Sequence, residues 1–218
     1  MKSVLVTGGT VRLGKAIADR LRADGWRVIT SSHRADAGAD IVADLADGMG
    51  AAKLYAAALQ LLGGQPPDAL VNNAALYVGD AAAVRAVGLE APKKLTMMMA
   101  GRETGVGAVV NVLDGALGSE VNSETSSDPK RPYCDAKREL QAFTLSSAMM
   151  FAASLRVNAV APGPVLAPTA VREKAGETLL ARRPTPDDVA AAVAFLLTSE
   201  SVTGAILPVD AGQHLLTL

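Results

Sequence analysis

The feature of this sequence that most constrains its fold is an alternation of short apolar runs with longer amphipathic ones. Several of the apolar runs are continuous, which is typical of parallel strands covered on both faces. Strands that alternate with helices predict βαβ units and therefore a parallel sheet. The expected strands are Ser3–Thr7, Arg27–Ser31, Asp40–Ala43, Ala69–Asn72, Ala108–Leu113, Leu155–Val160 and Ile206–Val209.

The longer runs between these strands are predicted to be helices. In the first of them Leu13, Ile17 and Leu21 recur every four residues, which makes one buried stripe. Before the last, Thr185 and Pro186 are suited to the N-cap and to the first helical position. The expected helices are Leu13–Ala23, Leu45–Leu62, Val87–Ala100, Pro132–Ala153 and Asp187–Leu197.

These elements predict an α/β fold, with right-handed crossovers and helices on both faces of the sheet. We expect a single-domain, Rossmann-like, doubly wound parallel sheet of about seven strands. No internal repeat or linker divides the chain, so residues 1–218 are expected to form one domain. Two Pro- or Ser-rich segments after strands, Asp114–Arg131 and Ala161–Arg183, are expected to be surface loops where such sheets bind ligands.

Composition narrows the class of protein. Half of the residues are hydrophobic and 20% are charged, which is typical of a globular chain with a sizeable core. A net charge of −1 argues against a nucleic-acid partner, and a single cysteine, Cys134, leaves no intrachain disulfide or Cys-based metal site. The chain starts directly with a strand-like run and has no membrane-length apolar stretch, so we expect a cytoplasmic protein without a membrane partner or a metal.

A glycine-rich turn joins the first strand to the first helix. Gly8 and Gly9 allow the backbone to turn sharply near a ligand, and Gly14 lets the helix lie close to the sheet. N–H groups at the start of that helix favour a phosphate. A purely structural turn is the alternative. The residues expected to hold a dinucleotide here are Gly8, Thr10, Arg12, Leu13 and Gly14.

The end of the second strand indicates which dinucleotide. An NAD site usually carries Asp or Glu there to accept a hydrogen bond from the ribose 2′-hydroxyl. This chain has His33 and Arg34 instead, and no carboxylate before Asp36. Together with Arg12 these side chains can surround a 2′-phosphate, which predicts NADP(H) as the cofactor. The alternative is that His33 and Arg34 belong to a solvated loop.

Tyr133 and Lys137 form the strongest chemical signal, because side chains at i and i+4 share one face of a helix. A nearby ammonium is expected to lower the pKa of the phenol, so that Tyr133 can act as a general acid in a hydride-transfer reaction. Lys137 can also hold the nicotinamide ribose. Asp114 follows the fifth strand, where a partly buried carboxyl can act as an acid. The alternatives are an exposed helix pair and a carboxylate that caps a turn.

The glycine turn and the Tyr133–Lys137 pair resemble those of the short-chain dehydrogenase/reductase family over nearly the whole chain. Arg12 replaces the middle glycine of that family's fingerprint, and Asp114 replaces its serine. Both replacements resemble the branch of pteridine and dihydromonapterin reductases. The resemblance implies further cofactor contacts from Asp44, Leu45, Asn73, Ala74, Pro162, Gly163 and Val165.

The same resemblance implies a small-molecule substrate that is a pterin. Tyr77 would stack on the pterin ring, Tyr133 would donate a proton, Asp114 would protonate or orient the ring, and Arg12 would help to hold it. Two other functions stay open. One is a carbonyl reductase acting on an oxoacyl thioester or a small ketone, and the other is a non-catalytic NADP-binding protein.

The chain departs from the family pattern in one helix. Gly88 occupies the position of a family asparagine that supports the lysine through water, and the segment from Asn73 to Gly88 is shorter than usual. The segment from Asp114 to Tyr133 is longer than usual. The resemblance also implies a homodimer or homotetramer formed through paired helices.

Overall fold

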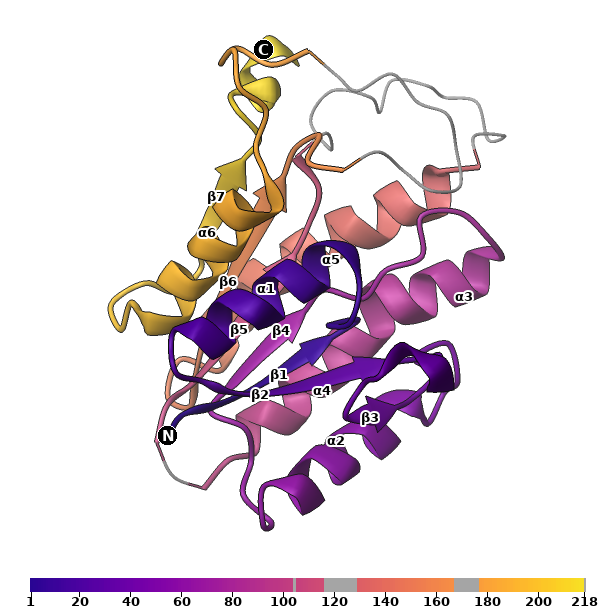
Figure 1. Ribbon diagram of the computed structural model, residues 1–218, viewed down its shortest axis with the longest axis vertical. Helices are drawn as coiled ribbons and strands as arrows, with labels where there is room; N and C mark the ends of the chain where they lie inside the picture. Colours follow the sequence, from indigo (N-terminus) through magenta and orange to yellow (C-terminus); the bar gives the residue numbers. More distant parts are fainter. Residues whose placement is uncertain (104, 116–128, 167–176, 218) are drawn as a thin grey trace.

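In the computed structural model, seven parallel strands form one sheet within the described residues, which are 1–103, 105–115, 129–166 and 177–217 (Figure 1). The strand order is β3-β2-β1-β4-β5-β6-β7, so the expected doubly wound sheet is confirmed. The order reverses between β1 and β4, and ligands of such sheets bind at the carboxyl edge beside this reversal. The strands are β1 Ser3–Thr7, β2 Arg27–Ser32, β3 Ile41–Val42, β4 Ala69–Asn72, β5 Gly107–Val112, β6 Leu155–Pro162 and β7 Ile206–Val209.

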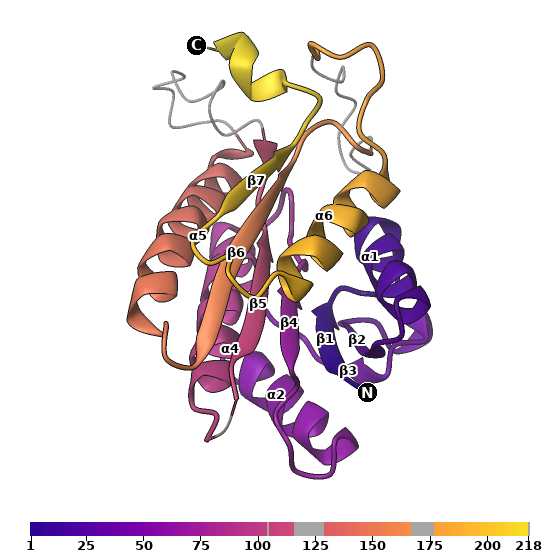
Figure 2. The same cartoon turned by 90° about the vertical axis from the view of Figure 1, so that its left-hand side faces the viewer.

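Helices cover both faces of the sheet, as Figure 2 shows. Helices α1 and α6 pack on one face, and α2, α4 and α5 pack on the other. The helices are α1 Arg12–Ala23, α2 Gly50–Leu61, α3 Ala81–Arg85, the π-helix η2 Ala86–Glu90, α4 Ala91–Ala100, α5 Arg131–Met150 and α6 Pro186–Thr198. Two 3₁₀ helices, η1 Ala35–Ala37 and η4 Gln213–Thr217, complete the set of described elements.

The central strand β1 shows how the two faces are filled. Val4 and Val6 pack in the core beneath α1 and α6, whereas Leu5 packs in the core on the α2 and α4 side. The predicted stripe on α1 is confirmed, because Ile17 and Leu21 are fully buried and Leu13 packs against the same core. No described helix is both long and apolar enough to cross a lipid bilayer.

The start of α6 follows the sequence prediction. Thr185 is the N-cap, and its hydroxyl accepts a hydrogen bond of 3.3 Å from the amide of Asp188. The carboxylate of Asp188 accepts in return from the amide of Thr185 at 2.7 Å, which completes a capping box.

Helix α5 ends at Met150 and not at Ala153, and two other helices begin elsewhere than predicted. Helix α2 begins at Gly50 rather than at Leu45, because Asp44 and Asp47 fold the intervening residues into side-chain-capped turns. The helix predicted from Val87 begins earlier, at Ala81, where Asp80 caps the chain by accepting from the amide of Ala83 at 2.9 Å.

Candidate active site

The glycine turn packs as tightly as its sequence predicts. Gly8 has a φ of +62°, which a residue with a side chain rarely adopts. A Cβ on Gly14 would lie 2.0 Å from the carbonyl oxygen of Gly8, and a Cβ on Gly9 would lie 2.8 Å from Cγ2 of Thr30. Helix α1 can therefore approach the turn only because these positions lack side chains.

The end of β4 holds this turn in place. The side-chain amide of Asn73 donates to the carbonyl oxygens of Thr7 at 3.0 Å and Gly8 at 3.2 Å. The hydroxyl of Thr7 accepts from the backbone amides of Asn73 at 2.9 Å and Ala74 at 3.0 Å. Asn73 thus positions the cradle, and Thr7, which sequence reasoning did not assign to the site, is its buried partner.

Arg12 is the first residue of α1 and has a φ of +50°. A left-handed conformation costs a residue with a side chain roughly 1–2 kcal/mol, whereas glycine adopts it freely. The predicted replacement of a glycine by Arg12 therefore costs stability, which an unfolding experiment can measure. Strain of this kind is concentrated at functional sites.

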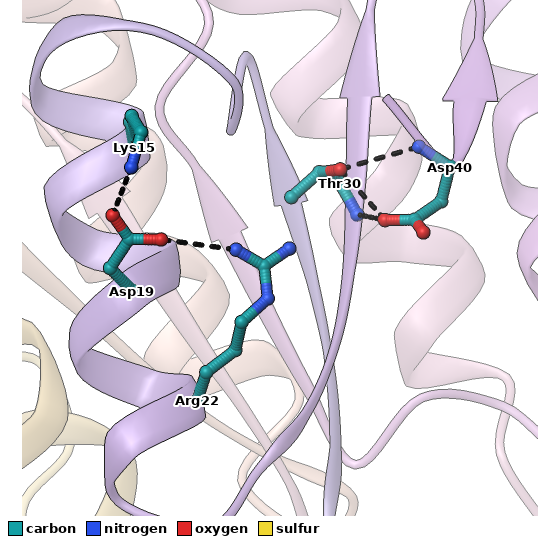
Figure 3. Close-up of polar contacts among 5 residues, drawn as sticks. All are labelled: Lys15, Asp19, Arg22, Thr30 and Asp40. Atoms are coloured by element: carbon teal, nitrogen blue, oxygen red, sulfur yellow. Dashed lines mark hydrogen bonds and ion pairs between the residues drawn. The ribbon is translucent and has the colours of Figure 1, made fainter. Parts of the chain in front are cut away.

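Figure 3 shows the polar contacts around α1 and β2. Asp40 accepts from the amide and hydroxyl of Thr30, both at 2.7 Å, which ties β2 to the segment before β3. On α1, Asp19 pairs with Lys15 and, at 3.2 Å, with Arg22. Lys15 is thus directed along its own helix, so Arg12 is the residue of this turn best suited to a phosphate.

The structure changes what can be expected of His33 and Arg34, the two residues after β2 that are predicted to surround a 2′-phosphate. Arg34 forms a two-bond pair with Asp36, with Nε–Oδ1 and Nη2–Oδ2 distances of 2.9 and 2.6 Å. This pairing raises the pKa of Arg34 and lowers that of Asp36. A 2′-phosphate would share Arg34 with that carboxylate, whereas His33 is simply exposed beside it.

Asp44 and Leu45 follow β3. Asp44 is exposed, and its carboxylate accepts from the amide of Ala46 at 2.9 Å, which caps a turn and not the start of a helix. The side chain of Leu45 is buried in the core beneath α2. Only the backbone of Leu45 is therefore left to meet a cofactor.

The three expected catalytic side chains meet at the carboxyl end of β5. The hydroxyl of Tyr133, in the first turn of α5, donates to Oδ2 of Asp114 at 2.8 Å. One turn later, Nζ of Lys137 lies 5.7 Å from the centroid of the Tyr133 ring and donates to the carbonyl oxygen of Val112 at 2.5 Å.

The prediction that Lys137 lowers the pKa of Tyr133 is wrong for this arrangement. Burial and the neighbouring Asp114 carboxylate raise the pKa of Tyr133 well above its usual value. The ammonium of Lys137 lies against the Val112 carbonyl and the face of the phenol ring. Tyr133 therefore keeps its proton at neutral pH, as a proton donor must.

Burial also lowers the pKa of Lys137 to about 8, although Asp114 opposes the shift. If the lysine cation is needed for turnover, kcat/KM should be flat below this value and fall as the pH rises through about 8. Tyr133 adds no loss in that range, because its pKa is raised. A pH–rate profile measures this, and activity that is constant well into the alkaline range would contradict it.

Tyr77 lies where the sequence places it, beside the catalytic group. Its ring centroid is 4.9 Å from that of Tyr133, and the two rings meet edge to face at 65°. Nζ of Lys130 lies over the Tyr77 ring, 5.9 Å from its centroid. Sequence reasoning did not predict this contact, because a lysine in a polar loop carries no signal that distinguishes it from a solvated charge.

Comparison with known proteins places this arrangement in a family. A sequence profile described as enoyl-(acyl carrier protein) reductase matches residues 11–214. Protein FixR of Bradyrhizobium diazoefficiens is 31% identical, with 98% of this chain and 87% of FixR covered. Acetoacetyl-CoA reductase of Allochromatium vinosum is 29% identical over 95% of this chain and 96% of its own.

A solved structure is also similar. FolM alternative dihydrofolate reductase 1 from Brucella canis, complexed with NADP, shares 29% identity and a TM-score of 0.84, covering 98% of this chain and 94% of that one. This chain belongs to the short-chain dehydrogenase/reductase family. It is an oxidoreductase of that family, and the glycine cradle is the shape that the family's dinucleotide requires.

The segment that the family resemblance assigns to the nicotinamide lies at the end of β6 and just after it. Gly163 donates its amide to the carbonyl oxygen of Val209 at 3.0 Å, and a Cβ on Gly163 would lie 2.6 Å from Cα of Asp210. The amide of Val165 donates to the carbonyl oxygen of Gly163 at 2.7 Å, which turns the chain after Pro162. Of the two expected loops, residues 116–128 and 167–176 lie outside the described residues.

The departure from the reductase pattern at Gly88 falls within the π-helix η2. Gly88 is buried, and a Cβ there would lie 3.5 Å from Cβ of Ala136, the residue before Lys137. The position of the family's asparagine thus faces α5. At this position Gly88 leaves room for van der Waals contact but provides no polar side chain.

Gly88→Ala is expected to stabilise the protein by about 0.5–1 kcal/mol, because alanine fits the available space and restricts the unfolded chain. Gly14→Ala is the matched control, since its Cβ would overlap the backbone of Gly8. It should destabilise the protein by about 1–3 kcal/mol. Urea unfolding shows whether each variant has a higher or lower free energy of unfolding than wild type. A destabilised Gly88→Ala would contradict the packing described.

Proposed function

We propose that this chain, residues 1–218 as one NADP-binding domain, reduces a pterin with NADPH. The substrate class is a dihydropterin or a dihydrofolate-like compound with a ring C=N bond. The observation that carries the proposal is the 2.8 Å hydrogen bond from Tyr133 to Asp114, a carboxylate where the family usually has serine. A ring nitrogen can use such a carboxyl as a proton donor or an orienting acceptor.

NADP(H) is the cofactor in this proposal. The similar solved structures include complexes with NADP and NADPH. In this chain the glycine turn would hold the diphosphate at the start of α1, whose N-cap Val11 provides no capping side chain. Arg12, with His33 and Arg34, would bind the 2′-phosphate. The residues expected along the rest of the cofactor are Asp44, Leu45, Asn73, Ala74, Tyr133, Lys137, Pro162, Gly163 and Val165.

When bound, NADPH supplies the hydride that adds to the carbon of the C=N bond. The hydroxyl of Tyr133 gives its proton to the nitrogen of that bond, and solvent later returns a proton to the phenolate. Lys137 would hold the nicotinamide ribose through its ammonium donors, while Asp114 orients the ring. Tyr77, edge to face with Tyr133, provides an aromatic surface for the flat substrate.

A carbonyl reductase is the second candidate, and the similarity to acetoacetyl-CoA reductase favours it. A carbonyl oxygen gains negative charge as it is reduced and is best stabilised by hydrogen-bond donors. The Asp114 carboxylate meets that requirement only when protonated. A non-catalytic NADP-binding protein has only Gly88 and the altered loop lengths in its favour, against the assembled Tyr133, Lys137 and Asp114.

Asp114→Ser and Asp114→Asn test the choice between the two enzymes. Under the proposal, both variants lose at least about tenfold in kcat/KM with dihydropterins, because the carboxyl is needed at the ring. Asp114→Ser should gain activity with acetoacetyl-CoA if a hydroxyl donor is what that reaction lacks. Undiminished pterin turnover by Asp114→Ser would overturn the role given to Asp114.

We propose further that the chain forms a homodimer or homotetramer and acts in the cytoplasm. Three apolar side chains on the C-terminal half of α5 are exposed, namely Leu145, Met149 and Met150, and Met97 is exposed on α4. Pairing of these helices between copies would cover them. Sedimentation equilibrium measures the mass of the assembly, and a monomer at micromolar concentration would contradict this assignment.

A further inference from the structure

A buried row of polar side chains, Asn72, Asn111 and Thr144, connects β4 and β5 to the catalytic helix α5. The reaction described above gives this polar row no role. We propose that Asn111 and Thr144 are positioning residues that hold the ammonium of Lys137 in its place at the end of β5. The inference rests on the proposed function only in taking Lys137 as a residue that serves the reaction, and it does not depend on which substrate is reduced.

The polar row is a chain of hydrogen bonds with one direction. The side-chain amide of Asn72 donates to Oδ1 of Asn111 at 2.8 Å. Nδ2 of Asn111 donates in turn to the hydroxyl of Thr144 at 2.9 Å, and this hydroxyl donates to the carbonyl oxygen of Leu140 at 2.8 Å. Asn72 therefore fixes which end of the Asn111 amide faces α5, because the reversed amide would set two NH₂ groups against each other.

Burial makes these hydrogen bonds sensitive to the position of the helix. Asn111 and Thr144 are fully buried, and Asn72 is 2% exposed, so water does not compete for their polar atoms. Apolar contacts are non-directional, but a shift of α5 along β5 would leave the buried amide of Asn111 without its acceptor. The polar row therefore fixes the position of α5 along the strand.

Lys137 is bound to the same strand and lies on the same face of the helix. Its Nζ donates at 2.5 Å to the carbonyl oxygen of Val112, the residue directly after Asn111. Lys137 and Thr144 are seven residues apart on α5, which places them on one helix face, and both are buried. A displacement of α5 that separated Thr144 from Asn111 would therefore also carry Nζ of Lys137 away from Val112.

An unsatisfied acceptor indicates that stability alone does not account for the polar row. Oδ1 of Asn72 is buried and has no hydrogen-bond partner among the described residues. Such an atom is unfavourable, and apolar side chains of similar shape would avoid it. Gly88, which faces α5 from η2, provides no polar side chain that could support the lysine. Support for Lys137 thus comes from β5 and from the polar row attached to it.

The pKa of Lys137 reports whether its ammonium is in place. Burial lowers this pKa to about 8, and the carboxylate of Asp114 opposes the shift. The ring of Tyr133 lies 5.7 Å from Nζ, while Glu90 in η2 pairs with Arg85 at 3.3 Å. A lysine released from its place would be better hydrated, so its pKa would rise towards the ordinary value.

Thr144→Val is the decisive variant, because valine has a similar shape and lacks the hydroxyl that Asn111 binds. Thr144→Ser restores the hydroxyl. Ser147→Ala is the matched control, because Ser147 is also buried on α5 but its hydroxyl donates only within the helix, to Phe143 at 2.5 Å and Thr144 at 3.2 Å. The titration of Lys137 would be followed by NMR of protein labelled with ¹³C-lysine, with Lys137→Met to assign the signal.

Thr144→Val is expected to move the midpoint of the Lys137 titration upward by at least about 0.5 in pH. It should also lower kcat/KM about tenfold below pH 7, because misplaced groups lose catalytic efficiency. Thr144→Ser and Ser147→Ala should stay close to wild type in both. An unchanged midpoint in Thr144→Val would overturn the inference, as would an equal change in Ser147→Ala. If Thr144→Val does not fold, Thr144→Ala, which leaves room for a water at Asn111, is judged by the same two outcomes.

The titration separates this inference from the pterin assignment, because it needs no substrate. If no pterin is reduced but the midpoint moves in Thr144→Val and not in Ser147→Ala, the pterin assignment fails and the positioning role stands. If pterins are reduced and the midpoint does not move, the proposed function stands and the inference is wrong.

Discussion

Tyr133→Phe is expected to lower kcat by about a thousandfold while leaving the affinity for NADPH within about twofold. The phenol keeps its proton because burial and Asp114 raise its pKa, so it is the donor for the atom that receives a proton. Phenylalanine preserves the ring that contacts Tyr77 and removes only the hydroxyl that carries this proton. Steady-state turnover and fluorescence titration with NADPH measure the two quantities.

Tyr77→Phe is the matched control for this variant, because it removes a neighbouring hydroxyl at the same site. It should raise KM for the substrate by less than about tenfold and change kcat little, if Tyr77 acts through its ring. A Tyr133→Phe protein with substantial turnover would exclude Tyr133 as the proton donor. Loss of NADPH affinity in that variant would mean that the cofactor lies elsewhere.

Arg12→Gly is expected to have the second-largest effect, with opposite signs for function and stability. Removing a charge-assisted contact to the 2′-phosphate should lower kcat/KM for NADPH about 10–100-fold and leave that for NADH nearly unchanged. The same change should stabilise the fold by about 1 kcal/mol, because glycine adopts the φ of +50° without strain. Paired kinetics and thermal unfolding measure both effects.

Lys15→Met is the control for Arg12→Gly, because Lys15 pairs with Asp19 on the same helix and should contribute little to cofactor choice. If Arg12→Gly affects NADPH and NADH equally, Arg12 does not bind the 2′-phosphate. If the variant is less stable than wild type, the arginine side chain stabilises the turn by more than its backbone strain costs.

The parts of the fold that were predictable depend on periodic burial and on local capping. Continuous apolar runs predicted the parallel strands, and the spacing of Ile17 and Leu21 predicted the buried face of α1. The glycine turn was predictable because Gly14 has no substitute where a Cβ would meet the Gly8 carbonyl. The start of α6 was predictable because Thr185 and Pro186 act on adjacent backbone.

Other parts of the fold were not predictable, because the sequence there is compatible with more than one local backbone or side-chain conformation. The aspartates at 44 and 47 cap turns instead of starting α2, although the sequence is compatible with both. Gly79 and Asp80 precede an alanine run that starts α3, a signal that could have been used. The pairing of Arg34 with Asp36 depends on side-chain rotamers that sequence spacing does not determine.

The candidate site likewise has features that the sequence predicts and features that depend on the tertiary structure. Helical spacing placed Tyr133 and Lys137 on one face, but the sign of the Tyr133 pKa shift depends on Asp114 and on burial, which only the tertiary structure provides. The contact between Lys130 and Tyr77 could not be predicted either, because more than fifty residues separate the two in the sequence.

The measurement that tests the central claim most directly is the rate of NADPH oxidation with dihydrobiopterin, dihydromonapterin and dihydrofolate, each beside an NADH control. The account predicts turnover of at least one pterin with NADPH and much slower turnover with NADH. Binding of NADPH without reduction of any pterin would contradict the pterin assignment, and faster turnover with NADH would contradict the role of Arg12.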